Sequence, residues 1–131
     1  MDPSGESRIA AELGRPDEAY KHFIDSYQPF MRGPMLMFNE KRSKTYDNIC
    51  FLTGCGGSLQ SVIYGFGGLR VGRAPQGFNQ LLPGLSIKPC LPPKWKKLQI
   101  TDIKWHGKRY DLTILPGNKW DLSEKGTGNR E

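Results

Sequence analysis

The spacing of apolar residues changes near residue 70, and this change most limits the folds open to the chain. Before it, apolar residues recur at helical spacing, and after it they alternate with polar neighbours as in strands. The helical set is Ala19, Tyr20, Phe23, Ile24 and Tyr27, and the alternating sets are Leu98 with Ile100, Ile103 with Trp105, and Tyr110 with Leu112 and Ile114. Helices followed by strands predict an α+β fold with segregated parts rather than βαβ units.

The first part of the chain predicts an αα-hairpin and a third helix. A helix over residues 7–13 should end at Gly14, a second should begin at Pro16, and Pro29 should end that one. Two helices joined by a short turn are the repeating unit of helical bundles and barrels. The third helix has Thr53 as its expected N-cap, followed by a glycine-rich first turn. Its apolar stripe is Leu59, Val62, Ile63 and Phe66.

The second part predicts a β-hairpin. One extra residue near Asp102 explains the shift in alternation as a β-bulge, and the chain should turn at 106–107 or 107–108. A short strand is expected at 86–88, closed by Pro89. We therefore divide the chain into helices and a long loop (1–70), a linker (71–82), a small antiparallel β-domain (83–118) and a polar tail expected to fray (119–131).

Composition narrows the class of protein. With 131 residues, 37% hydrophobic and 24% charged, the chain fits one modest globular domain, and it contains no apolar run of the roughly 20 residues that span a bilayer. The N-terminus lacks the pattern of a signal peptide, so the location stays open: cytoplasmic, or directed by a segment outside this chain. The odd set Cys50, Cys55 and Cys90 forms no CxxC pair and is interpreted as buried free thiols. We expect no metal and no cofactor.

The net charge of +6 is concentrated in the β-region. Six cations and one acid, Asp102, lie between Lys88 and Tyr110: Lys94, Lys96, Lys97, Lys104, Lys108 and Arg109. Such a stripe can attract a polyanion, and Trp95 and Trp105 would suit base stacking. The alternative interpretation is a solvated face of a β-sheet, which we favour because RNP and OB-type patterns are absent. We therefore do not expect nucleic acid as a partner.

Three segments together resemble the end of glycoside hydrolase family 65 enzymes. They are YQPFMRGPMLMFNEK, FLTGCGGSLQSVIYGFGGLRV and IKPCLPPKWKKLQITDIKWHGKRYDLTI. The resemblance covers about residues 7–115 and is closest to the hydrolase branch, which acts on glucosyl disaccharides and glucosyl-galactosyl units. It implies that the helices are the last ones of a six-hairpin α/α barrel, and that the strands form the C-terminal β-domain of such enzymes.

The resemblance also implies a role for Glu40. Inverting hydrolysis uses one carboxylic acid to protonate the leaving oxygen and one carboxylate to activate water. Hydrolases of this branch take the general base from the loop before the FLTG block, and Glu40 is the only carboxylate between Asp25 and Asp47. Asn39 would orient the water or bind a sugar hydroxyl. The alternative is that Glu40 is a surface carboxylate paired with Lys41 or Arg42.

Further candidate sugar-binding residues flank this loop. Gln28 and Arg32 precede it, while Gly56 and Gly57 open the third helix, where backbone N–H groups attract anions or hydroxyls. The alternative for the glycines is close helix packing. Because no basic residue lies in that turn, hydrolysis is favoured over phosphorolysis, although a phosphate site can draw on residues outside the chain.

The resemblance implies that the N-terminal domain, most of the barrel and the general acid are absent. We therefore expect a carbohydrate substrate for the whole enzyme but no activity from this chain alone. Helices without their neighbours would leave apolar stripes bare, including 19–27 and 59–66, so self-association is expected. The competing hypothesis is a non-catalytic binding module whose basic β-region binds a polyanion.

Overall fold

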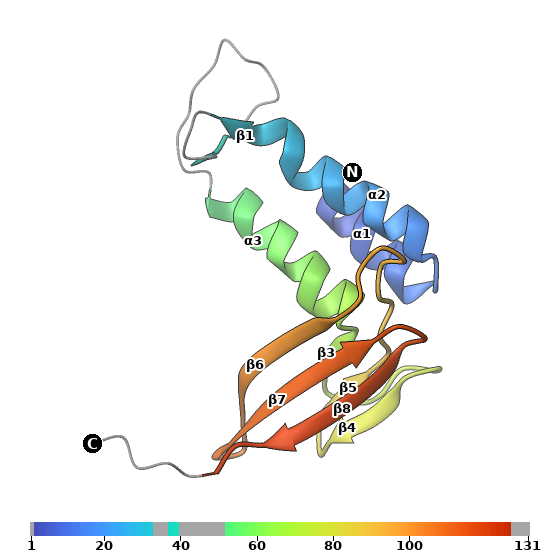
Figure 1. Ribbon diagram of the computed structural model, residues 1–131, viewed down its shortest axis with the longest axis vertical. Coiled ribbons are helices and arrows are strands. Elements are labelled where there is room, and N and C mark those ends of the chain that lie inside the picture. Colours follow the sequence, from blue (N-terminus) through green and yellow to red (C-terminus); the bar gives the residue numbers. More distant parts are fainter. Residues whose placement is uncertain (1, 33–36, 40–51, 127–131) are drawn as a thin grey trace, which may run out of the picture.

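The helices and strands of the chain were analysed in a computed structural model, which describes residues 2–32, 37–39 and 52–126. Figure 1 shows three helices on one side and two small antiparallel sheets on the other. The α+β class predicted from the sequence is confirmed. The helices come first along the chain and the strands follow, as the change of spacing near residue 70 indicates.

The first two helices form the expected hairpin. α1 (Pro3–Glu12) and α2 (Pro16–Tyr27) are joined through Gly14, whose φ of +73° reverses the chain. Pro16 occupies the first turn of α2, as predicted. A 3₁₀ turn, η1 (Gln28–Phe30), follows α2 directly.

The third helix ends in an unusual form. α3 (Leu52–Gln60) continues into the π-helical turn η2 (Ser61–Phe66), where the Gly67 N–H donates to the Val62 carbonyl oxygen. Thr53 lies inside α3 rather than at its N-cap, so that prediction is wrong. Gly68, with a φ of +66°, follows the turn. A Cβ at this position would overlap the Lys88 carbonyl, so only glycine permits this junction between helices and strands.

The strands form three antiparallel sheets. The short ribbon β1 (Met31–Arg32) and β2 (Met37–Phe38) follows η1. A second sheet has the order β3–β5–β4, with β3 at Leu69–Val71, β4 at Asn79–Leu82 and β5 at Leu85–Ile87. The third has the order β6–β7–β8, with β6 at Leu98–Trp105, β7 at Lys108–Leu115 and β8 at Lys119–Glu124.

The β6–β7 hairpin follows the sequence prediction closely. Its register shifts between Ile100 and Ile103, and Asp102 adopts a φ of +62°, which confirms the bulge. His106 and Gly107 have φ values of +48° and +76°, so the chain turns at the first of the two predicted positions.

Two segments that we expected to be irregular are strands. β4 lies in the predicted linker, and β8 lies in the predicted polar tail. β8 is stable because Trp120 and Leu122 pair with Ile114 and Leu112 of β7 and pack on the same core. Their spacing of two residues was a strand signal that the surrounding polar residues obscured.

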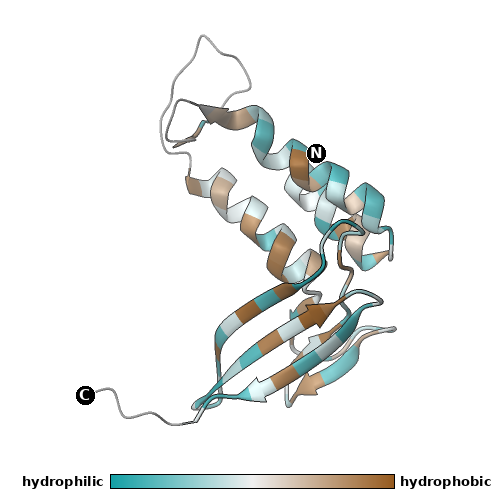
Figure 2. Ribbon diagram, viewed as in Figure 1, coloured by the Kyte–Doolittle hydropathy of each residue, from teal (hydrophilic) through white to brown (hydrophobic). Residues whose placement is uncertain are grey.

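The chain contains two adjoining hydrophobic cores. The helical core is built on Ala10, Ala11, Ala19, Phe66 and Cys90, and the sheet core on Leu69, Ile87, Leu91, Leu112 and Ile114. Figure 2 shows the alternation of hydrophobic and hydrophilic residues along β6, β7 and β8 that produces the second core. Trp95 and Leu98 pack against both cores and join them.

The expectation that the stripe over residues 19–27 is bare is wrong. Ala19 is fully buried, and Phe23 packs against Phe66 and Trp95. The stripe is covered because the β-region supplies Trp95 and α1 covers the other side. Exposed apolar side chains lie elsewhere on the helices, at Ile9, Leu13, Leu52, Leu59 and Tyr64.

Candidate functional site

Two helix ends meet at one end of the helical layer. α3 begins there, α2 ends there, and the β1–β2 ribbon follows α2 at the same end, while α1 begins farther along α3 (Figure 1). We call the end of the molecule that carries this ribbon the ribbon end.

The start of α1 was missed in the sequence. The helix begins at Pro3 instead of residue 7, and Asp2 is its N-cap. The Ser4 backbone N–H donates to Asp2 Oδ1 over 3.4 Å, and the Ser4 hydroxyl donates to the other carboxylate oxygen. An aspartate followed by proline is a start signal for a helix, so the sequence did contain this information.

A hollow of about 490 Å³ lies between the first two turns of α1 and the face of α3 that runs from Thr53 to Gln60. Its lining is polar or glycine, with one carboxylate and one guanidinium. The lining residues are Asp2, Ser4, Gly5, Arg8, Thr53, Gly56, Gly57 and Gln60. Hydroxyl, amide and backbone groups of this kind hydrogen-bond neutral polar ligands such as sugars and water.

The two candidate glycines line this hollow but differ in their surroundings. A Cβ added at Gly57 would lie 2.7 Å from the Ser4 hydroxyl oxygen, so this glycine permits close packing of α1 on α3. A Cβ at Gly56 would meet no atom within 4 Å. Close packing therefore explains Gly57, while at Gly56 the backbone remains open to the hollow.

The remaining site predictions fall on the ribbon and its approach. Gln28 is exposed at the start of η1, and Arg32 lies in β1 opposite Met37. Asn39 follows β2, is only 2% exposed, and its backbone N–H donates to the Phe30 carbonyl oxygen over 2.8 Å. Glu40 lies outside the described residues. Gln28 and Asn39 thus both lie at the ribbon end, Gln28 before the ribbon in the chain and Asn39 after it.

Serine hydroxyl groups fix the three helices to one another. Ser7 on α1 donates to the Ala19 carbonyl over 2.8 Å, and Ser61 donates to the Ser4 carbonyl over 3.0 Å. The Ser26 and Ser58 hydroxyl oxygens lie 3.0 Å apart. These bonds link α1 to α2, η2 to α1 and α2 to α3, so α1 and α3 keep a fixed separation across the hollow.

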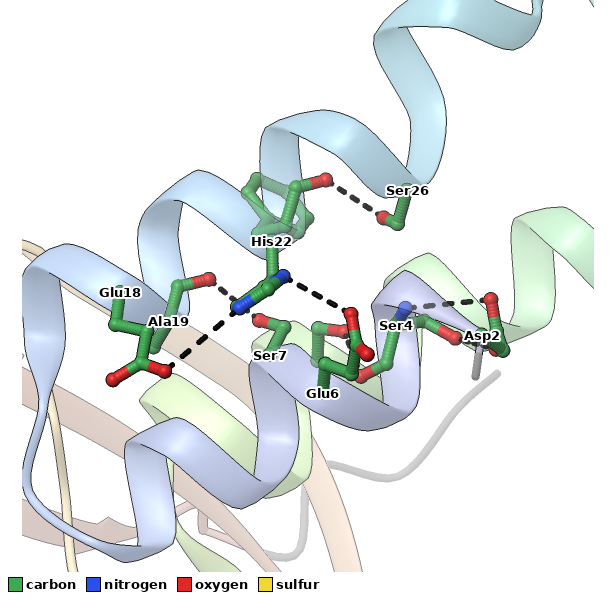
Figure 3. A network of polar contacts seen from close by, with 10 residues as sticks. Asp2, Ser4, Glu6, Ser7, Glu18, Ala19, His22 and Ser26 are labelled. Atoms are coloured by element: carbon green, nitrogen blue, oxygen red, sulfur yellow. Dashed lines mark hydrogen bonds and ion pairs between the residues drawn. The ribbon is translucent and has the colours of Figure 1, made fainter. Parts of the chain in front are cut away.

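His22 adds a polar contact between α1 and α2. Its Nδ1 lies 3.2 Å from Glu6 Oε2 and its Nε2 lies 4.0 Å from Glu18 Oε1, as Figure 3 shows with the neighbouring serine contacts. The sequence had given no role to this histidine. Among the described residues, no three His, Cys, Asp or Glu side chains are grouped to hold a metal ion.

The cysteines in the described part of the chain are free. Cys90 is buried in the helical core, and burial raises the pKa of its thiol, with the positive charge of Lys88 opposing this shift. Cys55 is partly exposed. Both are unpaired thiols, as predicted, but only Cys90 is buried as expected, and Cys50 lies outside the described residues.

The basic stripe of the β-region is partly neutralised by acids. Arg109 donates to the Asp102 carboxylate, and Lys108 Nζ lies 3.7 Å from Glu124 Oε2. The hydrogen bond from Arg109 lowers the pKa of Asp102 below its usual value. Trp95 packs among helix aromatics, and Trp105 Nε1 donates to the Pro83 carbonyl over 2.8 Å. Both tryptophans therefore have partners within the protein.

The β-region also matches a known family. Residues 84–118 match the C-terminal domain of glycosyl hydrolase family 65. The matched segment begins just before β5 and ends just after β7. The chain carries the C-terminal region of glycosyl hydrolase family 65. No helix in the described ranges is long and apolar enough to cross a membrane.

Relatives in this family cover the helices as well. A kojibiose hydrolase of Flavobacterium johnsoniae is 41% identical over 82% of this chain, and one of Mucilaginibacter mallensis is 37% identical over 78%. A kojibiose phosphorylase of Caldanaerobacter subterraneus is 32% identical over 82%. The chain spans only 14% of the length of either hydrolase and 12% of the phosphorylase.

Proposed function

We propose that this chain is the C-terminal portion of a family 65 glycoside hydrolase that cleaves glucosyl linkages in oligosaccharides. In this proposal the reaction is inverting, Glu40 is the general base, and the general acid lies in a part of the enzyme outside this chain. The two carboxyl groups of such enzymes are about 6.5–9.5 Å apart, which leaves room for the attacking water. The chain alone is then inactive.

The observation that supports this proposal is the polar hollow between α1 and α3. It adjoins the start of α3, and β2, which leads into the segment containing Glu40, contacts the same helix. A sugar bound there would meet the Thr53 hydroxyl, the Gln60 amide and the open backbone at Gly56. These groups match the donors and acceptors of sugar hydroxyls.

The charge distribution of the hollow favours water over phosphate as the attacking molecule. Asp2 already occupies the anion-binding position at the start of α1, where its carboxylate accepts from the Ser4 N–H and hydroxyl. A phosphate ion would compete with this carboxylate and be repelled by it, while Arg8 is the one cation among the lining residues. Water and neutral hydroxyls meet no such repulsion.

The test uses a hybrid enzyme, in which this chain replaces the matching 107 residues of the Flavobacterium johnsoniae kojibiose hydrolase. We expect the hybrid to release glucose from kojibiose without added phosphate. Glu40→Gln should lower kcat by about 10²–10⁴-fold, because the amide cannot accept the proton from water.

A matched control separates catalysis from a general effect of removing a carboxylate. Asp17→Asn changes an exposed acid in the first turn of α2 and should leave kcat unchanged. If Glu40→Gln retains the turnover of the unmodified hybrid, the proposed role of Glu40 is wrong. Glucose release that requires phosphate would overturn the choice of water.

A further inference from the structure

Trp95 lies where the helical core meets the sheet core. It follows a tight turn in which its backbone N–H donates to the Pro92 carbonyl over 3.0 Å. Its side chain is half-buried and packs against both cores. Since this residue precedes β6, the β-region inserts its own aromatic side chain between the helices.

The indole contacts three aromatic rings of the helices. Ring centroids lie 5.2 Å away at Phe66, 6.0 Å at Phe23 and 6.3 Å at Tyr20, with interplanar angles of 69°, 87° and 81°. These are edge-to-face arrangements, which aromatic pairs prefer and which fix the relative orientation of the rings. Two of the rings lie on α2 and one lies at the end of η2, so Trp95 contacts both helices.

The contacts continue along α2 to the ribbon end. The Phe23 ring lies 5.1 Å from the Tyr27 ring, and Tyr27 is the last residue of α2. Beyond η1, the rings of Phe30 and Phe38 stack 5.6 Å apart. The Phe30 carbonyl oxygen accepts the Asn39 backbone N–H. Ring contacts along α2, the backbone of η1, a second ring pair and one hydrogen bond therefore connect the β-region to Asn39.

We propose that Trp95 is a positioning residue for the glycosidase reaction: it holds α2 so that the ribbon after that helix presents Asn39 at the ribbon end. This inference rests on the proposed function. It gives the C-terminal β-region a role in the reaction, through the helices, although none of its residues lines the hollow. A shift of about 1 Å at a reacting group lowers turnover by up to about 10²-fold, so loss of this support should be visible in kcat.

The kinetic test compares two tryptophans in the hybrid enzyme. Trp95→Leu removes the ring that contacts α2, whereas Trp105→Leu removes a ring whose hydrogen bond goes to Pro83 within the β-region. At a temperature where both variants are fully folded by circular dichroism, Trp95→Leu should lower kcat about 10- to 100-fold with little change in KM. Trp105→Leu should keep the original kcat, and Trp95→Phe should restore part of the loss.

A second measurement does not depend on activity. In this chain, Trp95→Leu should increase the hydrogen exchange rate of the Asn39 amide, measured by NMR, well beyond any increase in Trp105→Leu. If Glu40→Gln leaves the hybrid active while this exchange still responds, the reaction assignment fails and the link from Trp95 to Asn39 stands. Equal kcat in the two leucine variants, or equal exchange at Asn39, would overturn the positioning role.

Discussion

The helical half, described at residues 2–32, 37–39 and 52–67, and the β half, residues 68–126, bury different kinds of side chain. Large apolar residues, Ile87, Leu112 and Ile114, are fully buried in the β half. Among the described residues of the helical half, Phe66 is the one large apolar side chain that is fully buried, and the small residues Ser7 and Ser61 are also fully buried. Small residues let the helices approach closely but bury little apolar area.

This difference indicates that the two halves are stabilised differently. The β half closes its own core with paired strands. The helical half takes Trp95 from the β half and still exposes Leu52 and Leu59 on α3, by 78% and 61%. We infer that the β half supports the helices, which in turn carry the residues of the candidate site.

The largest effect should follow from a cavity in the sheet core. Leu112→Ala removes a fully buried side chain and should lower the free energy of unfolding by about 2–5 kcal/mol in urea denaturation. The matched variant Leu59→Ala removes the same atoms from an exposed position and should change it by less than about 0.5 kcal/mol. Similar losses in both variants would contradict the contrast between the halves.

The packing of α1 on α3 should be weakened by a larger side chain at Gly57 but not by one at Gly56. Gly57→Ala places a methyl group 2.7 Å from the Ser4 hydroxyl, which is held by Asp2, and should cost about 1–3 kcal/mol. Gly56→Ala meets no atom within 4 Å and should stabilise the helix by up to about 1 kcal/mol. Thermal unfolding by calorimetry distinguishes them, and equal melting temperatures would show that the packing is looser than described.

Self-association should depend on the exposed leucines of α3. Leu52 and Leu59 are seven residues apart and therefore lie on one face, so a double change to Lys should shift the isolated chain toward the monomer in sedimentation velocity. The control is Leu115→Lys, an exposed apolar residue at the end of β7. An equal shift in the control would assign association to the β half.

The smallest effect should come from the bulge in β6. Arg109 lowers the pKa of Asp102, so this pair stabilises the fold above the pKa of the unfolded carboxyl and ceases to do so as the pH falls through the folded pKa. Asp102→Asn removes the charge but keeps a residue type that tolerates the positive φ. The variant should therefore melt at a lower temperature than the original chain at pH 6, and the two melting temperatures should converge at lower pH. Asp121→Asn, an exposed change in β8, should show no such trend.

Local features of the fold were accessible from the sequence. The Asp102 bulge, the turn at His106–Gly107 and the hairpin turn at Gly14 each depend on residues adjacent in the chain, and all three are confirmed. β8 was missed because two apolar residues among polar ones resemble a tail. The start of α1 was missed because residues 3–6 carry no apolar side chains at helical spacing.

The candidate site was only partly accessible. Gly56 and Gly57 were candidates because of the glycine-rich segment around them, and they line the hollow, but Asp2, Ser4 and Arg8 line the same hollow from about 50 residues away, and no local pattern predicts that approach. The contact between Trp95 and Phe23 spans 72 positions and has the same difficulty. The π-helical form of η2 also depends on long-range packing, since the Cys90 N–H donates to the Phe66 carbonyl oxygen.

Native-state hydrogen exchange of the intact chain tests the contrast between the halves most directly. We predict that the amides of Leu112 and Ile114 in β7 exchange only through global unfolding, while those of Ala10 and Ala11 in α1 exchange through an opening of lower free energy. The same exchange free energy in β7 and α1 would contradict this account, because the two halves would then open as one unit.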